Sequence, residues 1–211
     1  MTTYYKYPRT YHLPFSPGTT NEDRILSSTE HLKNMMVVIT EKLDGGNFSL
    51  YPDYIHARSI NSRYHLSESI IREIHATIKN DIPYGYRICV ENCYAKHSCF
   101  YDKLISFVYI ISVWNDKNVC LSWDETKKWA ELLGLEVVPE LYVGIYDEEQ
   151  IKRCWTGISK FGNEQEGYVG RNINAFHYDD FSENTFKYVR KGHVVSGEHW
   201  RKNWIPNKLK E

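Results

Sequence analysis

The chain lacks the features that mark membrane, secreted and repeat proteins. It has no run of about 18 apolar residues, and its N-terminus carries no apolar signal segment. We therefore expect a soluble, cytoplasmic protein with no membrane partner. No internal repeat, low-complexity tract or linker interrupts the 211 residues, a length typical of one sizeable domain rather than two.

Paired cysteines and a strong net charge are also missing. None of the five cysteines belongs to a Cys-x-x-Cys motif, which favours reduced intracellular thiols over a zinc site. The net charge is −1, so any nucleic-acid surface has to be a local basic patch. Apolar residues make up 42% and aromatic residues 15% of the chain. This composition supplies a packed core and argues against disorder.

Hydrophobic patterning predicts a domain dominated by strands. Three short strands are expected within 36–59, and further strands at 86–90, 105–114, 135–138, 167–171 and 185–189. Residues 1–30 have no clear periodicity and are expected to form an irregular arm. Residues 196–211 form a short basic extension, in which Trp200 and Trp204 are expected to pack rather than to stack RNA bases. The class is therefore α+β, with largely antiparallel sheets flanked by helices.

Three helices are expected between these strands. Ser67 is the predicted cap of a helix that reaches about residue 80. Ser122 and Glu125 form a capping box for a second helix, which Gly134 ends. Asp147 opens a third helix. The apolar faces of the first and third helices consist of Ile70, Ile74 and Ile78, and of Ile151, Trp155 and Ile158.

Residues 41–47, Glu-Lys-Leu-Asp-Gly-Gly-Asn, are the most informative stretch. They place Lys42 on a glycine-permitted bend between two strands, where the backbone is expected to approach a phosphate closely. A lysine that attacks a phosphate has to be neutral, and with a pKa near 10.4 only roughly one in a few thousand is neutral at pH 7. Such a site has to lower that pKa, neutralise the phosphates and offer an apolar slot for a base.

The stretch Lys42-Leu-Asp44-Gly resembles motif I of the covalent nucleotidyltransferases, which comprise ATP-dependent DNA and RNA ligases and mRNA-capping enzymes. In these enzymes the lysine becomes attached to a nucleoside monophosphate. Sequences similar to the remaining motifs follow in order across about residues 36–195. The resemblance implies the following roles: Arg58 for ribose and RNA, Glu91 for the ribose hydroxyls, Ile111 for base stacking, Glu166 for metal or phosphate, and Lys187 with Arg190 or Lys191 for phosphates.

Asn47-Phe48-Ser49 narrows the resemblance to RNA ligases, because DNA ligases and capping enzymes usually carry arginine where this chain has Asn47. The stretches Glu-Asn-Cys-Tyr-Ala-Lys-His and Lys-Tyr-Val-Arg-Lys-Gly-His-Val are similar to small RNA ligases of phages and bacteria, with animal relatives. The resemblance implies an ATP-dependent ligase that joins RNA 5′-phosphate and 3′-hydroxyl ends through a lysyl-AMP intermediate. ATP and Mg²⁺ or Mn²⁺ are the expected cofactors, and no obligate protein partner is inferred.

The resemblance further implies one nucleotidyltransferase domain over residues 1–211 that lacks an OB-fold barrel, since few residues follow motif V. Glu41 and Asn47 are expected at the nucleotide, and Asp44 either positions the loop or helps to bind metal. Lys96 and His97 are either RNA contacts or solvated loop residues.

The arm around Lys6, Arg9 and His12 is a candidate RNA contact. A DNA ligase or a capping enzyme is the first alternative function. A non-catalytic nucleotide- or RNA-binding relative is the second, and it would be expected to have lost at least one of the charged motif residues.

Overall fold

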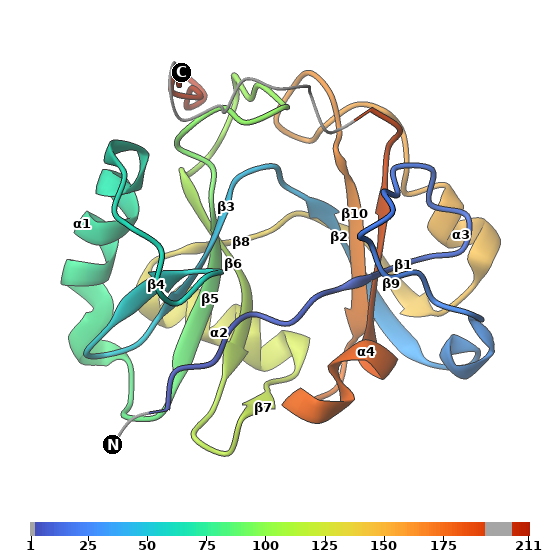
Figure 1. Ribbon diagram of the computed structural model, residues 1–211, viewed down its shortest axis with the longest axis horizontal. Coiled ribbons are helices and arrows are strands. Elements are labelled where there is room, and N and C mark those ends of the chain that lie inside the picture. The colour runs from blue at the N-terminus through green and yellow to red at the C-terminus, as the bar shows by residue number, and fades with distance from the viewer. Residues whose placement is uncertain (1–2, 193–203) are drawn as a thin grey trace.

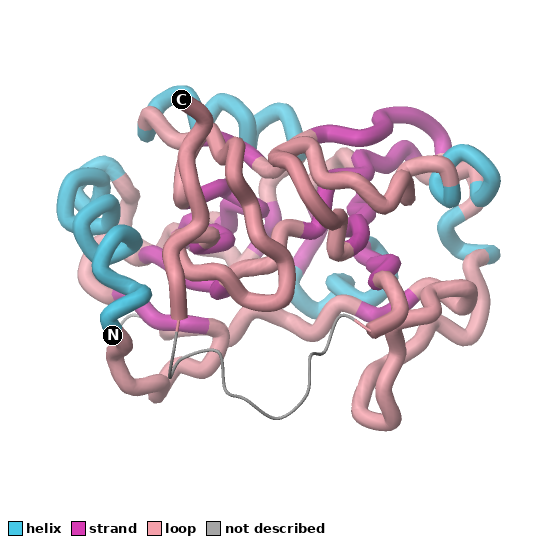
Figure 2. The backbone as a smooth tube through the Cα atoms, turned by 90° about the horizontal axis from the view of Figure 1, so that it is seen from above, coloured by secondary structure: helices cyan, strands magenta, loops and turns pink. Residues whose placement is uncertain are grey.

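A computed structural model describes residues 3–192 and 204–211. Two β-sheets face each other across a central cleft, and the N-terminal arm crosses from one sheet to the other (Figure 1). Seen from above, helices lie at the periphery and strands lie between them (Figure 2). Residues 193–203, including Trp200, lie outside the described residues. No helix in the described ranges is long and apolar enough to span a membrane.

The first sheet carries the strand that ends at Lys42. Its strands, in spatial order, are β1 (Tyr11–His12), β12 (Thr185–Val189), β10 (Gly167–Asn172), β2 (Met36–Lys42) and β9 (Glu140–Ile145). All neighbours are antiparallel except β1 and β12. Along β2, Val37 and Ile39 pack into the core behind the sheet while Val38 packs on the other side, as the two-residue period of a strand requires. Thr40 and Lys42 lie on the same face of β2 as Val38, and both line the cleft.

The second sheet forms the opposite wall. Its main path is β11 (Phe176–His177), β7 (Val119–Cys120), β6 (Val108–Trp114), β5 (Arg87–Asn92), β3 (Gly46–Leu50) and β4 (Ile55–Ala57), with β8 (Glu136–Val137) parallel to β6. An apolar core behind this sheet buries Ile71 and Ile78 of α1 (Ser69–Ile78) and Ala130 and Leu133 of α2 (Trp123–Leu133). The remaining helical segments are α3 (Glu148–Lys152), α4 (Phe181–Asn184), η1 (Glu30–Leu32), η2 (Leu66–Glu68), η3 (Lys79–Asp81) and η4 (Tyr178–Asp180).

The fold confirms the α+β class with largely antiparallel sheets. It also confirms the predicted ends of α2: Ser122 and Glu125 form the complete capping box, and Gly134 adopts the left-handed conformation that ends the helix. All five cysteines are free and buried. The predicted packing of Trp204 is confirmed as well, since its ring lies 5.3 Å from that of Tyr94.

Three local predictions were wrong, and the strand β9 was missed. Ser67 does not cap α1, because its hydroxyl bonds to His65 within the preceding 3₁₀ turn. The third helix ends at Lys152, so Trp155 packs on Tyr188 instead and Ile158 is 70% exposed. The arm is not wholly irregular, since β1 adds a strand to the first sheet. The strand β9 was not predicted, although Leu141, Val143 and Ile145 alternate along it.

Candidate active site

The turn after Lys42 is held by hydrogen bonds to β5 of the second sheet and to the loop that follows this strand. Oδ2 of Asp44 accepts bonds from the backbone N–H and the hydroxyl of Ser98, both 2.6 Å, and from the N–H of Cys99 at 2.7 Å. The N–H of Gly45 donates to Oε1 of Glu91 at 3.2 Å. A side chain at Gly45 would collide with the carbonyl of Asn92 on β5. The first glycine is therefore required by close approach to a strand, whereas the sequence had suggested close approach to a phosphate.

Lys42 lies at the junction of the two central strands of the first sheet. β2 and β10 pair so that Lys42 stands opposite Gly167, the residue after Glu166. This register brings Nζ of Lys42 within 2.7 Å of Oε2 of Glu166. The lysine side chain is 26% exposed and the glutamate side chain 5%. The pairing of two strands thus joins residues 124 positions apart into one ion pair.

The carboxylates around Lys42 oppose the effect of its burial. Burial alone lowers the pKa of Lys42, but Glu166, Glu91 and Asp44 together raise it above the ordinary value. Burial raises the pKa of Glu91 to about 8 and that of Glu166 to about 7, although Lys42 pulls both values down. Without a nucleotide, the lysine is therefore held as an ammonium group against Glu166.

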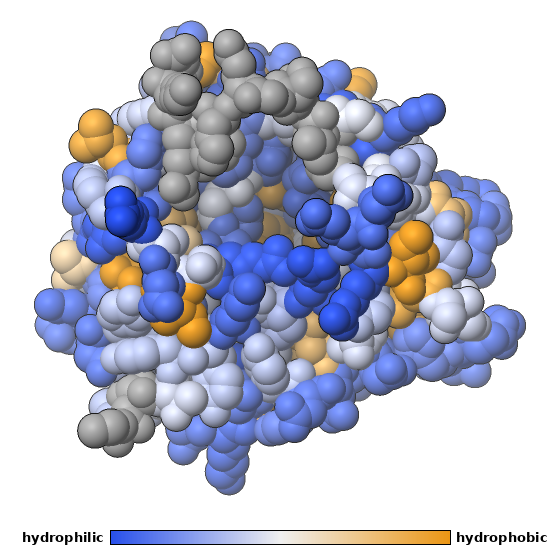
Figure 3. All heavy atoms as spheres, viewed as in Figure 1, coloured by the Kyte–Doolittle hydropathy of each residue, from blue (hydrophilic) through white to orange (hydrophobic). Residues whose placement is uncertain are grey.

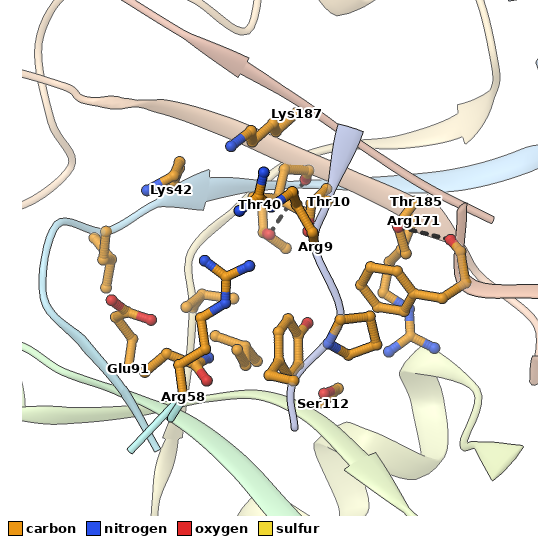
Figure 4. Close-up of a pocket in the computed structure, with 18 of the residues that line it drawn as sticks. Arg9, Thr10, Thr40, Lys42, Arg58, Glu91, Ser112, Arg171, Thr185 and Lys187 are labelled. Atoms are coloured by element: carbon orange, nitrogen blue, oxygen red, sulfur yellow. Dashed lines mark hydrogen bonds between the residues drawn. The ribbon is translucent and has the colours of Figure 1, made fainter. Parts of the chain in front are cut away.

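A cavity of about 460 Å³ opens beside this ion pair. In the space-filling view the face is hollowed at its centre, with strongly hydrophilic side chains along the edge of the hollow (Figure 3). Of the residues predicted from sequence, the cavity is lined by Glu41, Lys42, Asn47, Arg58, Glu91, Ile111 and Lys187. These residues come from both sheets, and Lys42 and Lys187 project from one wall while Glu91 and Arg58 project from the other (Figure 4).

One part of the cavity lining is apolar and fits a nucleobase. Leu43, Ile111, Val138 and Val169 contribute aliphatic side chains from both walls. Ile111 on β6 was the residue predicted to stack on the base, and it lies in this part of the lining. An apolar slot with few polar groups is the usual form of a small-molecule site.

Lys187 lies on β12, on the same cavity wall as Lys42. Its ammonium group is 3.8 Å from Oδ1 of Asp23, which comes from the N-terminal arm. Burial and the charge of Lys42 lower the pKa of Lys187 to about 8, despite Asp23 and Glu166, which raise it. Lys187 is thus a cation whose charge is lost just above neutral pH.

Some predicted residues do not line the main cavity. Glu166 is one of them and contacts Lys42 beside it, and Asp44 is another, since it bonds to Ser98 and Cys99. Arg190 pairs with Glu164 at 2.9 Å, and Lys191 is exposed. His97 lines a neighbouring cavity of about 250 Å³ that shares Asn47 and Arg58 with the main one. The roles of Arg190, Lys191 and His97 therefore remain predictions, as does that of Lys96, whose backbone N–H donates to the carbonyl of Ile205.

The cavity also contains residues that the sequence did not reveal. Arg9 and Asp23 reach it from the arm, Thr40 from β2 and Arg171 from β10. The alternation of side chains along a strand could have revealed two of these residues. Thr40 shares a face of β2 with Lys42, and Arg171 shares a face of β10 with Val169. Nothing in the pattern of residues 1–30 pointed to Asp23, and Arg9 was expected only as a candidate RNA contact. His12 was a candidate RNA contact, but this prediction was wrong because its side chain is 1% exposed and bonds to Ser16.

A divalent cation fits this site as part of a nucleotide complex. Within residues 3–192 and 204–211, no group of three or more histidine, cysteine, aspartate and glutamate side chains forms a ready metal site. Mg²⁺ commonly binds through one or two carboxylates and the phosphates of its substrate. Glu91, which lines the cavity, and Glu166, which contacts Lys42, would supply such oxygen ligands. Asp44 is less suited, since one of its oxygens already accepts three hydrogen bonds.

Two sheets that enclose a nucleotide-sized cavity, with a lysine ion-paired inside it, define a protein of the nucleotidyltransferase type. Residues 35–189 match the family model of RNA ligase, and the chain belongs to this family. A search of curated protein sequences gave no match.

Solved structures of RNA ligases share the fold. The Naegleria gruberi RNA ligase with PPi is 19% identical with a TM-score of 0.58, over 87% of this chain and 57% of that chain. An archaeal ATP-dependent RNA ligase is 13% identical with a TM-score of 0.55, over 87% of this chain and 48% of the other. The chain thus spans about half the length of these proteins.

Proposed function

We propose that the protein is an ATP-dependent RNA ligase that joins 5′-phosphate and 3′-hydroxyl ends through a lysyl-AMP intermediate. The observation that carries the proposal is the position of Lys42. Its Nζ is 2.7 Å from Glu166 inside a cavity with further cations and an apolar slot. The proposal includes one nucleotidyltransferase domain over residues 1–211 and a cytoplasmic location.

The first step is the transfer of AMP to Lys42. Glu166 accepts a proton from Nζ, for which its raised pKa of about 7 makes it a suitable base. The lone pair of the neutral amine then forms a bond to the α-phosphorus of ATP, and the nitrogen releases its second proton to solvent. The bond from this phosphorus to the bridging oxygen breaks, and its electron pair leaves with pyrophosphate. Lys187 and Arg58 neutralise phosphate charge on the two cavity walls.

The next two steps move AMP to the RNA and then release it. An oxygen of the RNA 5′-phosphate attacks the phosphorus of lysyl-AMP, and the nitrogen of Lys42 leaves with a proton. A 3′-hydroxyl then attacks the activated 5′-phosphate and gives up its proton to solvent, so that the phosphodiester bond forms and AMP is expelled. Asn47 and Arg58 line both the main cavity and its smaller neighbour, so this junction is the proposed entry for the RNA end.

ATP with Mg²⁺ or Mn²⁺ is the proposed cofactor set. Naegleria gruberi RNA ligase variants of the same fold have been solved with ATP and Mn and with AMP and Mn. A bound divalent cation would supply charge neutralisation at the phosphates, next to Glu166 and Glu91.

The direct test is incubation of the protein with α-labelled ATP and Mg²⁺ or Mn²⁺. We expect a labelled protein band that disappears in Lys42→Ala, and retention of the label in this variant would refute the assignment of the nucleophile. Comparison of ATP with GTP, and of nicked or single-stranded 5′-phosphorylated RNA with DNA, separates an RNA ligase from a capping enzyme or a DNA ligase. Nucleotide binding without any labelling would indicate a non-catalytic relative.

A further inference from the structure

We propose that Arg9, from the N-terminal arm, binds the β- and γ-phosphates of ATP, which leave as pyrophosphate. Arg9 lies outside residues 35–189, the part of the chain that matches the RNA ligase family. The proposal rests on the proposed function, because it assigns a further residue to the same nucleotide site.

The arm is attached to both walls of the cleft. On the second sheet, the backbone N–H of Tyr5 donates to the hydroxyl of Tyr51 at 2.8 Å. On the first sheet, Tyr11 in β1 pairs in register with Phe186 in β12. The residues between these two anchors, which include Arg9, therefore cross the cleft (Figure 1). Fixed ends of this kind hold Arg9 near one place without any bound ligand.

The side chain of Arg9 points into the nucleotide cavity. In the close-up it comes from the arm and extends toward the wall that carries Lys42 and Lys187, while Arg58 extends from the opposite wall (Figure 4). Nη1 of Arg9 donates to the carbonyl of Glu22 at 2.6 Å. In the described part of the chain this is its one hydrogen bond, so the remaining guanidinium N–H groups are available to a ligand.

The charges in the cavity leave a role for Arg9. Lys42 has to give up its proton to attack, so it cannot neutralise the triphosphate at that moment. Lys187 already faces Asp23 at 3.8 Å. Among the described residues, three arginines line the cavity without a carboxylate partner, Arg9, Arg58 and Arg171, and Arg171 is buried. A planar guanidinium suits phosphate oxygens because it can donate two parallel hydrogen bonds.

The position of Arg9 favours the β- and γ-phosphates over the α-phosphate. The α-phosphate has to lie at Nζ of Lys42, which is largely buried between the two walls. Arg9 is exposed at the rim of the same cavity. The phosphates beyond the α-phosphate extend toward the solvent, where the leaving pyrophosphate has to exit. Arg171, the other arginine of the lining, is buried and donates to the carbonyl of Leu121.

The first experiment measures the binding of ATP and AMP by calorimetry in the Lys42→Ala background, which prevents covalent transfer. We expect Arg9→Ala to weaken ATP binding about tenfold or more, as for loss of a charge-assisted hydrogen bond, and to leave AMP binding within a factor of two. Arg9→Lys should restore part of the ATP affinity. Equal weakening for ATP and AMP, or none for either, would overturn the proposal.

Arg24→Ala is the matched control. Arg24 belongs to the same arm and is exposed, but it donates to the hydroxyl of Tyr11 at 2.7 Å and does not line the cavity. The Arg24→Ala variant should bind ATP and AMP with the same affinities as the Lys42→Ala protein that carries no second substitution. Thermal melting of each variant shows whether the arm stays folded, and a loss of ATP affinity in Arg24→Ala as large as that in Arg9→Ala would overturn the assignment.

The second experiment separates the nucleotide from the RNA end, since both present phosphate. We expect Arg9→Ala, with Lys42 intact, to load AMP from ATP slowly and to seal pre-adenylylated RNA at the normal rate. A defect confined to the transfer of AMP onto the RNA 5′-phosphate would make Arg9 an RNA contact and overturn the proposal. If the parent protein takes no label from ATP, the ligase proposal fails, while the comparison of ATP with AMP still decides the role of Arg9.

Discussion

Lys42 and Lys187 line the same cavity from strands that flank β10, yet their protonation equilibria shift in opposite directions. The pKa of Lys42 lies above its ordinary value, whereas that of Lys187 falls to about 8. Burial acts against the charged form of both lysines. The difference arises from their neighbours: Lys42 has Glu166, Glu91 and Asp44 around it, and Lys187 has Lys42 close by with fewer compensating carboxylates.

This contrast separates the roles of the two lysines. The nucleophile is stored as an ion-paired ammonium group, which keeps it unreactive without substrate. Its activation requires that Glu166 take the proton, or that phosphates and a cation change the field around it. Lys187, by contrast, is a phosphate-binding cation that is already close to losing its charge.

Glu166→Gln should have the largest effect. The variant keeps the shape of the side chain but removes the carboxylate that contacts Nζ of Lys42. We expect the rate of lysyl-AMP formation to fall roughly 100-fold or more, the usual contribution of a general base. Because Glu166 raises the pKa of Lys42, the rising limb of the residual rate should move to lower pH. Single-turnover labelling across pH measures both effects, and an unchanged rate would exclude Glu166 as the proton acceptor.

Substitution of Lys187 should change the alkaline side of the pH profile. Its charge is present below pH 8 and is lost above, so kcat/KM for ATP should fall on that side in the parent protein. Lys187→Arg should remove this falling limb, since arginine stays charged. Lys187→Met should lower kcat/KM about tenfold or more at pH 7, as for loss of a charged hydrogen bond. If the limb persisted in Lys187→Arg, another group would be responsible for it.

The residues behind this contrast differ in how far the sequence reveals them. Lys42, Glu91 and Lys187 were predicted to share a site, and they line one cavity. These residues could be predicted from the sequence because each lies on or at the end of a strand with clear hydrophobic patterning. The order of the motifs also indicates which strands contribute to the same site. The opposed pKa directions could not be read from the sequence, because they depend on distances between side chains from different strands.

The arm shows where such prediction stops. Asp23 and Arg9 reach the cavity through a two-residue strand and isolated hydrogen bonds, which leave no periodic signal. The same limit applies to the third helix, where the cap at Asp147 was visible but the early end at Lys152 was not. Residue patterns report which face a segment buries over several turns, whereas single tertiary contacts decide where short segments lie.

Asp23→Asn tests how the N-terminal arm contributes to the pKa of Lys187, and it should change kcat/KM less than the substitutions of Glu166 and Lys187. Asp23 raises the pKa of Lys187, so its loss should move the falling limb of kcat/KM to a pH below that of the parent. The rate at pH 6 should change little, because Lys187 stays charged there. The same pH series measures this shift. His12, 3.4 Å from Asp23, also loses its partner, so a His12→Gln variant is needed to show that the shift does not come from the histidine.

Ser122→Ala should have the smallest effect, and it tests whether the contrast between the lysines is local. The variant removes the hydroxyl that caps α2, a helix that packs behind the second sheet and does not line the nucleotide cavity. Loss of such a cap costs about 1 kcal/mol of unfolding free energy, which for a chain of this size corresponds to a fall in Tm of about 2–4 °C. The limbs of the pH–rate profile that are assigned to Lys42 and Lys187 should not shift, because the pKa of each lysine is set by charged groups close to its own side chain. A shifted limb in this variant would mean that the field in the cleft depends on how the second sheet is held, and that the neighbours named here are an incomplete account of why the two lysines differ.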